Sequence, residues 1–154
     1  ELLRQMRYIL QSAQVPGYAF YSASIFDKLH VPIRDSIQKH YNMHPAFPPV
    51  MKWLDSIPPV APKLKAIPSS QGSLLQWEQT NPSNETLRYA VYRFVNNETI
   101  DLNRTDKIIS LQSKKEFLDE TANKYHNATY VVTTLDRLWN ESKPSNPATT
   151  RGDQ

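Results

Sequence analysis

Two stretches of this chain, residues 73–79 (SLLQWEQ) and 87–95 (LRYAVYRFV), decide its fold. In the first stretch, Leu75 and Trp77 share one side and polar side chains occupy the other. Such alternation is typical of a strand with one face in a core and the other in water. We therefore predict a strand here, with Trp77 at the centre of the core.

The second stretch is apolar or aromatic on both sides. Its pattern leaves open whether Tyr89 and Val91 or Tyr92 and Phe94 face the core. A strand that is apolar on both faces is covered on both. Residues 1–57 are the candidate cover for the outward face.

Short apolar segments separated by turn residues continue on either side of these two stretches. The predicted strands are 63–67, 73–79, 87–95, 107–111, 116–120, 128–135 and 142–148. Seven strands at this spacing are typical of a β-sandwich of the fibronectin-III kind. Tyr130 occupies the place of a tyrosine corner, whose hydroxyl bonds to backbone just upstream. We predict a mainly β fold, with a fibronectin-III-like sandwich over residues 63–148.

Residues 1–57 have a different pattern. Apolar side chains follow helical spacing over residues 1–13, and a second helix is expected to begin at Pro32. Between them, residues 17–26 (GYAFYSASIF) read as a buried strand of an α/β fold. One strand and two helices cannot close a domain, so we predict that this segment belongs to something larger.

Two short segments flank the predicted sandwich. Residues 58–62 (PPVAP) contain three prolines, which favour an extended, semi-rigid linker. Residues 149–154 are polar and are predicted to form a flexible tail. The tail includes Arg151-Gly152-Asp153, an integrin-adhesion tripeptide, but it lacks the tight hairpin that presents such a tripeptide. We read it as a chance occurrence.

Composition excludes several classes of function. The 154 residues carry a formal net charge of +3, with Lys and Arg spread along the chain. Nucleic-acid binding needs a clustered basic face, so none is predicted. The absence of cysteine excludes disulfides and thiol catalysis. No apolar run approaches the ~18 residues of a membrane span.

Two histidines resemble a metal-binding pair. His40 and His44 have the spacing of a zinc-binding helix pair, but Pro45 breaks the helix and the glutamate partner is missing. We expect no metal site and no cofactor.

Five N-x-S/T sequons are expected to be turn residues that carry no glycan. They begin at Asn84, Asn97, Asn103, Asn127 and Asn140. The Trp139 ring either stacks on a bound sugar or packs against other parts of the protein.

Four stretches resemble a known module: PPVAPKLKAI, SLLQWEQ, LRYAVYRFVNNETIDL and YVVTTLDRLWNESKPS. They are similar to the C-terminal fibronectin-III-like module of the bacterial glycosyl-hydrolase-like 10 family. Upstream, GYAFYSASIF and PAFPPVMKW resemble the end of that family's (β/α)₈ barrel. The resemblance implies that residues 1–57 are the C-terminal remnant of a glycosidase-like barrel. It also implies an exported or cell-envelope protein.

The resemblance implies a non-catalytic fragment of a bacterial glycoside hydrolase, with the sandwich as its accessory module. The glycan substrate would bind the missing barrel. Tyr21, Ser22 and Ser24 lie towards the end of the presumed last barrel strand, where substrate contacts gather. We expect them to contact substrate in the complete protein. Hydrolysis usually needs two carboxylates, and no pair can be placed on this chain, so we expect no catalytic residues and no activity from it.

Two other interpretations stay open. The chain is alternatively a self-sufficient carbohydrate-binding or cell-surface module, or an adhesion module that uses its Arg-Gly-Asp tripeptide. Apolar surface on residues 1–57 would also allow self-association.

Overall fold

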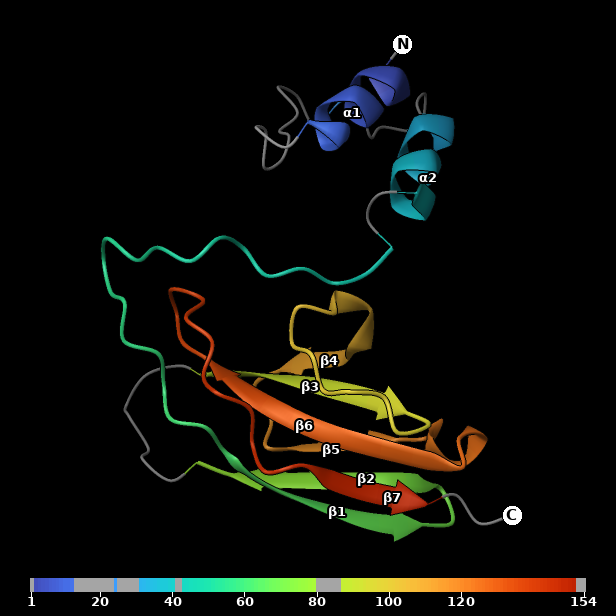
Figure 1. Ribbon diagram of the computed structural model, residues 1–154, viewed down its shortest axis with the longest axis vertical. Helices are drawn as coiled ribbons and strands as arrows, with labels where there is room; N and C mark the ends of the chain where they lie inside the picture. Colours follow the sequence, from blue (N-terminus) through green and yellow to red (C-terminus); the bar gives the residue numbers. More distant parts are fainter. Residues whose placement is uncertain (1, 13–23, 25–30, 41–42, 80–86, 152–154) are drawn as a thin grey trace. The chain divides into compact units, whose positions relative to one another are not determined.

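The structure is a computed structural model that describes residues 2–12, 24, 31–40, 43–79 and 87–151 (Figure 1). The chain forms two compact units, Glu1–Met43 and His44–Gln154. The sequence predicts a boundary after residue 57, whereas the structure groups residues 44–57 with the second unit. The assignment of residues 1–57 to a barrel remnant stays a prediction.

The first unit contains two short helices, α1 (Leu2–Gln11) and α2 (Val31–His40). Met6 is buried on α1 and Ile37 on α2, so each helix has one apolar side as its spacing predicted. The strand predicted over residues 17–26 lies outside the described residues, apart from Ser24. No described helix is long and apolar enough to cross a membrane.

The second unit contains two antiparallel sheets, drawn as two layers in Figure 1. The first sheet has the order β1 (Lys63–Ser69), β2 (Gly72–Glu78), β5 (Glu116–Asp119). The second sheet has the order β4 (Ile108–Gln112), β3 (Arg88–Val95), β6 (Asn127–Leu135), β7 (Ala148–Arg151). The predicted mainly β sandwich is confirmed. Its assignment to the fibronectin-III class stays a prediction.

The main core is formed by inward-facing side chains of both sheets. Its buried members are Leu64, Leu75, Trp77, Tyr89, Val91, Ala128, Tyr130 and Val132. Trp77 is 3% exposed, and its ring packs edge-on against the Tyr89 ring with centroids 5.5 Å apart. The predicted central position of Trp77 is confirmed. The open question about β3 is also answered, because Tyr89 and Val91 are the residues that face inward.

The opposite side of the four-stranded sheet carries a second apolar cluster. Its buried members are Ala90, Tyr92, Phe94, Ile108, Val131 and Leu135. Phe47, Leu102 and Trp139 pack against this cluster from outside. The strand pattern is therefore apolar on both sides because both faces of β3 are covered. Phe47 supplies part of the cover predicted to come from residues 1–57.

The seventh predicted strand, 142–148, is wrong in its position. The last strand is β7 (Ala148–Arg151), and it pairs with the start of β6. The physical reason lies in Pro144 and Pro147, which lack the N–H groups of a continuous ladder. Ser142 and Ser145 replace the ladder, since each donates its N–H to a β6 carbonyl and accepts a β6 N–H on its hydroxyl.

The predicted tail and linker are both attached to the sandwich. Residues 149–151, predicted as flexible tail, belong to β7, and Thr150 is buried with its hydroxyl 2.7 Å from that of Ser73. The rest of the Arg-Gly-Asp tripeptide lies outside the described residues. In the predicted linker, Val60 accepts a 3.0 Å hydrogen bond from the Gln79 side chain.

Tyr130 does not form the backbone contact expected of a tyrosine corner. Its hydroxyl donates instead to the Asp119 carboxylate, at 2.9 Å. Asp119 ends β5 in the opposite sheet, so this bond joins the two sheets. The carboxylate is the stronger acceptor for a buried hydroxyl, because hydrogen bonds to ionised groups exceed those to neutral ones.

Candidate functional site

The three predicted substrate contacts are placed only in part. Tyr21 and Ser22 lie outside the described residues, and Ser24 is exposed. Their role in binding substrate stays a prediction.

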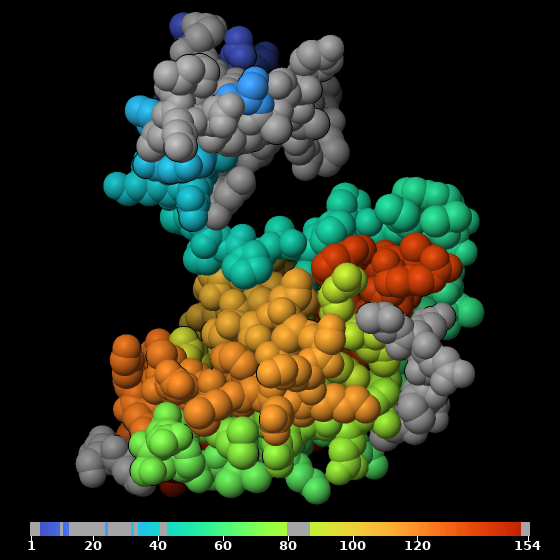
Figure 2. Space-filling view, turned by 180° about the vertical axis from the view of Figure 1, so that it is seen from behind, coloured from blue at the N-terminus to red at the C-terminus, as the bar shows by residue number. Residues whose placement is uncertain are grey.

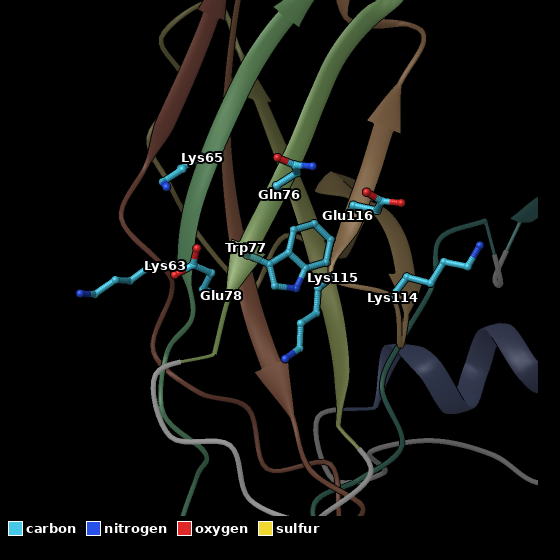
Figure 3. A pocket seen from close by; sticks show the side chains of 8 residues that line it. All are labelled: Lys63, Lys65, Gln76, Trp77, Glu78, Lys114, Lys115 and Glu116. Carbon is cyan, nitrogen blue, oxygen red and sulfur yellow. The ribbon is translucent and has the colours of Figure 1, made fainter.

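A shallow groove lies on the three-stranded sheet, with a volume of about 730 Å³ (Figure 3). Its lining residues are Lys63, Lys65, Gln76, Trp77, Glu78, Lys114, Lys115 and Glu116. Cross-strand pairing brings the polar ones together, since Lys63 lies opposite Glu78 and Lys65 opposite Gln76. Successive side chains alternate between faces, so these polar residues share the solvent side while Trp77 points into the core.

The groove has the chemistry of a polar binding surface. Four ammonium groups and two carboxylates line it, and Figure 3 shows Lys63 and Lys114 directed to opposite sides. A glycosidase general acid needs burial to stay protonated near neutral pH. Glu78 and Glu116 are exposed, so neither lies in such a setting. The groove is suited to hydrogen bonding and to anionic groups rather than to acid catalysis.

A buried charged network connects the two sheets. The Arg93 guanidinium donates to Asp119 at 2.8 Å and to the Thr121 hydroxyl at 2.5 Å. It also lies 4.5 Å from the centre of the Tyr125 ring. Sequence reasoning missed this network. The available signal was Arg93 itself, a charge on the same side of β3 as Tyr89 and Val91.

The protonation of the network is fixed by its contacts. Burial raises the pKa of Asp119, but hydrogen bonds from Thr121, Arg93 and Tyr130 outweigh it and leave that pKa below its usual value. Burial, and then the hydrogen bond to Asp119, raises the pKa of Tyr130 to about 12. The carboxylate therefore stays ionised and the phenol neutral around pH 7. Such groups stabilise the fold and are poorly suited to proton transfer.

Trp139 lies on a tightly bonded loop in the LDRLWNES stretch. The Asp136 carboxylate accepts the backbone N–H of Leu138 at 2.8 Å and that of Asn140 at 2.9 Å. Trp139 itself has a φ of 67°, an uncommon value for a residue with a side chain. Its half-buried ring stacks on Phe47, with centroids 6.1 Å apart, and lies 4.9 Å from the Arg88 guanidinium. Of the two interpretations, the structure shows packing.

The sequons differ in their accessibility. Asn140 is 5% exposed, and its amide donates to the Asp136 carboxylate and to the Asp55 carbonyl. That amide is occupied in the folded chain and is not open to modification. Asn97 and Asn103 are exposed, and Asn84 lies outside the described residues.

The described residues thus define a β-sandwich module with a polar groove, an internal charge network and a packed outer aromatic cluster. In sequence, the chain is 36% identical to the protein named Glycosyl hydrolase YngK of Bacillus subtilis (strain 168). The match covers 97% of this chain and 30% of that protein, so the chain spans less than a third of its relative. No family model matches the chain.

Solved structures of other proteins resemble the chain weakly. The β-1,2-glucanase from Parabacteroides distasonis has a TM-score of 0.49 at 19% identity, covering 65% of this chain and 14% of that one. Pectate lyase PelI from Erwinia chrysanthemi has a TM-score of 0.47 at 21% identity, covering 59% and 28%. Likenesses at this level carry no inference about function.

Proposed function

We propose that this chain is the C-terminal, non-catalytic portion of a bacterial glycoside hydrolase of the glycosyl-hydrolase-like 10 family. The observation that carries the proposal is the 36% identity, along 97% of the chain, to a protein named as a glycosyl hydrolase. Because the chain matches only 30% of that relative, most of the relative's length is available for a catalytic domain. In the proposal, the glycan binds that domain and the sandwich is its accessory module.

The state of the described carboxylates supports an accessory role. Several are engaged in ion pairs or hydrogen bonds within the sandwich: Asp119 with Arg93, Glu98 with Lys107, Asp106 with Arg104, and Glu141 with Tyr92 and Thr133. A pair for hydrolysis would need one protonated and one ionised carboxyl facing a sugar. The paired groups above do not offer that arrangement.

The strand order supports a fibronectin-III-like module. Three strands form one sheet and four the other, with β4 beside β3 rather than beside β5. Residues 1–43, the first compact unit, then belong to the end of a (β/α)₈ barrel, with Tyr21, Ser22 and Ser24 near its substrate. An exported or cell-envelope location completes the proposal.

Glycan hydrolysis tests this proposal. The 154-residue chain and the full-length gene product should be assayed for reducing-sugar release from cell-wall glycan and plant polysaccharides. We expect release by the full-length product and none by the chain, because the catalytic carboxylates lie in the other domain. Release by the chain alone, or by neither protein on any glycan, would contradict the proposal.

A second candidate function is glycan binding by the sandwich itself, which the lysine-lined groove favours. Affinity electrophoresis of the chain in gels containing neutral or acidic polysaccharide tests it. Retardation that is lost when Lys63 and Lys65 are both replaced by glutamine would support a binding module. Unchanged mobility in every gel would leave the accessory role as the better account.

A further inference from the structure

An exposed apolar surface lies on the segment that precedes the sandwich. Five of the ten exposed large hydrophobic side chains among the described residues fall between positions 51 and 60. They are Met51, Trp53, Leu54, Ile57 and Val60. Trp53 and Ile57 are each 77% exposed. We call these five residues the apolar strap. Large exposed apolar patches mark interaction sites on folded proteins.

The strap keeps its shape although it has no regular secondary structure. Its tightest part is a turn in which Leu54 and Asp55 donate their N–H groups to the Met51 carbonyl, at 2.9 and 3.3 Å. The Asp55 carboxylate accepts the N–H of Ile57 at 2.9 Å. These bonds fix Trp53 at the tip of a turn. Its side chain is thus presented to solvent rather than free to fold back.

The strap is also held on the sandwich at three points. Phe47 stacks on Trp139 just before it, Asn140 donates to the Asp55 carbonyl at 3.3 Å, and Gln79 donates to the Val60 carbonyl. Figures 1 and 2 show the segment running along the sandwich beside the loop that contains Trp139. A surface fixed in this way loses little conformational entropy when a partner binds.

The composition of the strap favours a protein partner over a sugar. Sugar platforms combine an aromatic face with hydrogen-bonding groups around it. Trp53 is instead accompanied by exposed aliphatic side chains, among them Leu54 and Ile57. Tryptophan and methionine are enriched in protein interfaces, where a central tryptophan often contributes most of the binding energy.

We propose that the apolar strap is the docking surface for the catalytic domain of the same polypeptide. This inference rests on the proposed function. The partner is chosen because the relative named as a glycosyl hydrolase is more than three times as long as the matched region, which covers 30% of it. A neighbouring domain in the same chain has a high effective concentration, so a small apolar contact suffices to hold it.

Hydrogen–deuterium exchange tests the docking. We expect the amides of residues 51–57 to exchange at least about tenfold more slowly in the full-length protein than in the 154-residue chain. Trp53→Ser together with Ile57→Ser should abolish the difference without changing the melting temperature of the 154-residue chain, because both side chains are exposed there. Ile100→Ser is the matched control, since Ile100 is an exposed apolar residue outside the strap. It should leave the protection unchanged.

Three outcomes would overturn the docking. Equal exchange in both proteins would show that the catalytic domain does not cover the strap. If protection of the 154-residue chain rises with protein concentration, the strap binds a second copy of the chain. If protection appears only when glycan is added, the strap binds sugar. The proposed function fails separately: a full-length protein that hydrolyses glycan but leaves the strap unprotected contradicts only the docking.

Discussion

Replacing Asp119 with alanine should lower the free energy of unfolding by about 3–5 kcal/mol, because Arg93 then becomes a largely buried cation without its carboxylate. Asp119 is 4% exposed and the Arg93 side chain 16%. The variant also leaves the hydroxyls of Tyr130 and Thr121 without their acceptor. Urea denaturation of the 154-residue chain at pH 7 measures the change.

The matched control is Asp106→Ala. Asp106 also pairs with an arginine, at 2.6 Å, but in an exposed turn where solvent screens the pair. We expect the urea midpoint of this variant to stay at the wild-type value. An Asp119→Ala midpoint equally close to wild type would contradict the structural role of the network.

The Asp119 contribution should depend on pH. Its pKa is lower in the folded chain than in the unfolded one, so the ionised carboxylate stabilises the fold above the unfolded pKa of about 3.9. That stability is lost as the pH falls through the folded pKa. The difference in stability between wild type and Asp119→Ala should therefore shrink below about pH 4. A difference that grows in acid would reverse the assigned sign.

Trp77→Ala should destabilise the sandwich by about 3–5 kcal/mol, the usual cost of removing a buried aromatic side chain. Trp77 lies at the centre of the main core and packs against the Tyr89 ring. The loss leaves a cavity between the sheets that the paired strands cannot close. Chemical denaturation followed by circular dichroism measures it.

Trp77→Phe is the informative companion variant. The Nε1–H of Trp77 is buried without a hydrogen-bond partner within the described structure. An unsatisfied buried donor costs about 1–3 kcal/mol, so phenylalanine removes a penalty while keeping an aromatic ring. We expect Trp77→Phe to cost clearly less than Trp77→Ala. Equal costs would mean that the smaller ring restores none of the packing, and would contradict this expectation.

Much of the sandwich follows from local pattern. The alternation around Leu75 and Trp77 predicted the strand, its inward face and the central tryptophan. Six predicted strands match observed ones within a few residues, since turn residues separate them clearly. The stretch over residues 87–95 is apolar on both sides, and this correctly indicated that both faces of the strand are covered. Because both sides are apolar, the pattern did not show which side faces the main core.

The remaining features depend on contacts between distant residues. The misplaced seventh strand shows this, because Ser142 and Ser145 pair with β6 through side chains that no strand pattern records. Asp119 and Arg93 are 26 positions apart and meet only after the sheets pack. The attachment of residues 44–57 to the sandwich depends on single contacts such as Phe47 with Trp139, which composition does not reveal.

If catalysis lies outside the sandwich, as proposed, removal of the sandwich should leave turnover intact. The most direct measurement compares kcat for glycan hydrolysis by the full-length protein with kcat for a version ending at Pro62, which lacks every sandwich strand but retains the strap. We predict the same kcat for both, with a lower melting temperature for the shortened protein. Loss of kcat in a shortened protein that still folds, as judged by circular dichroism, would contradict the account.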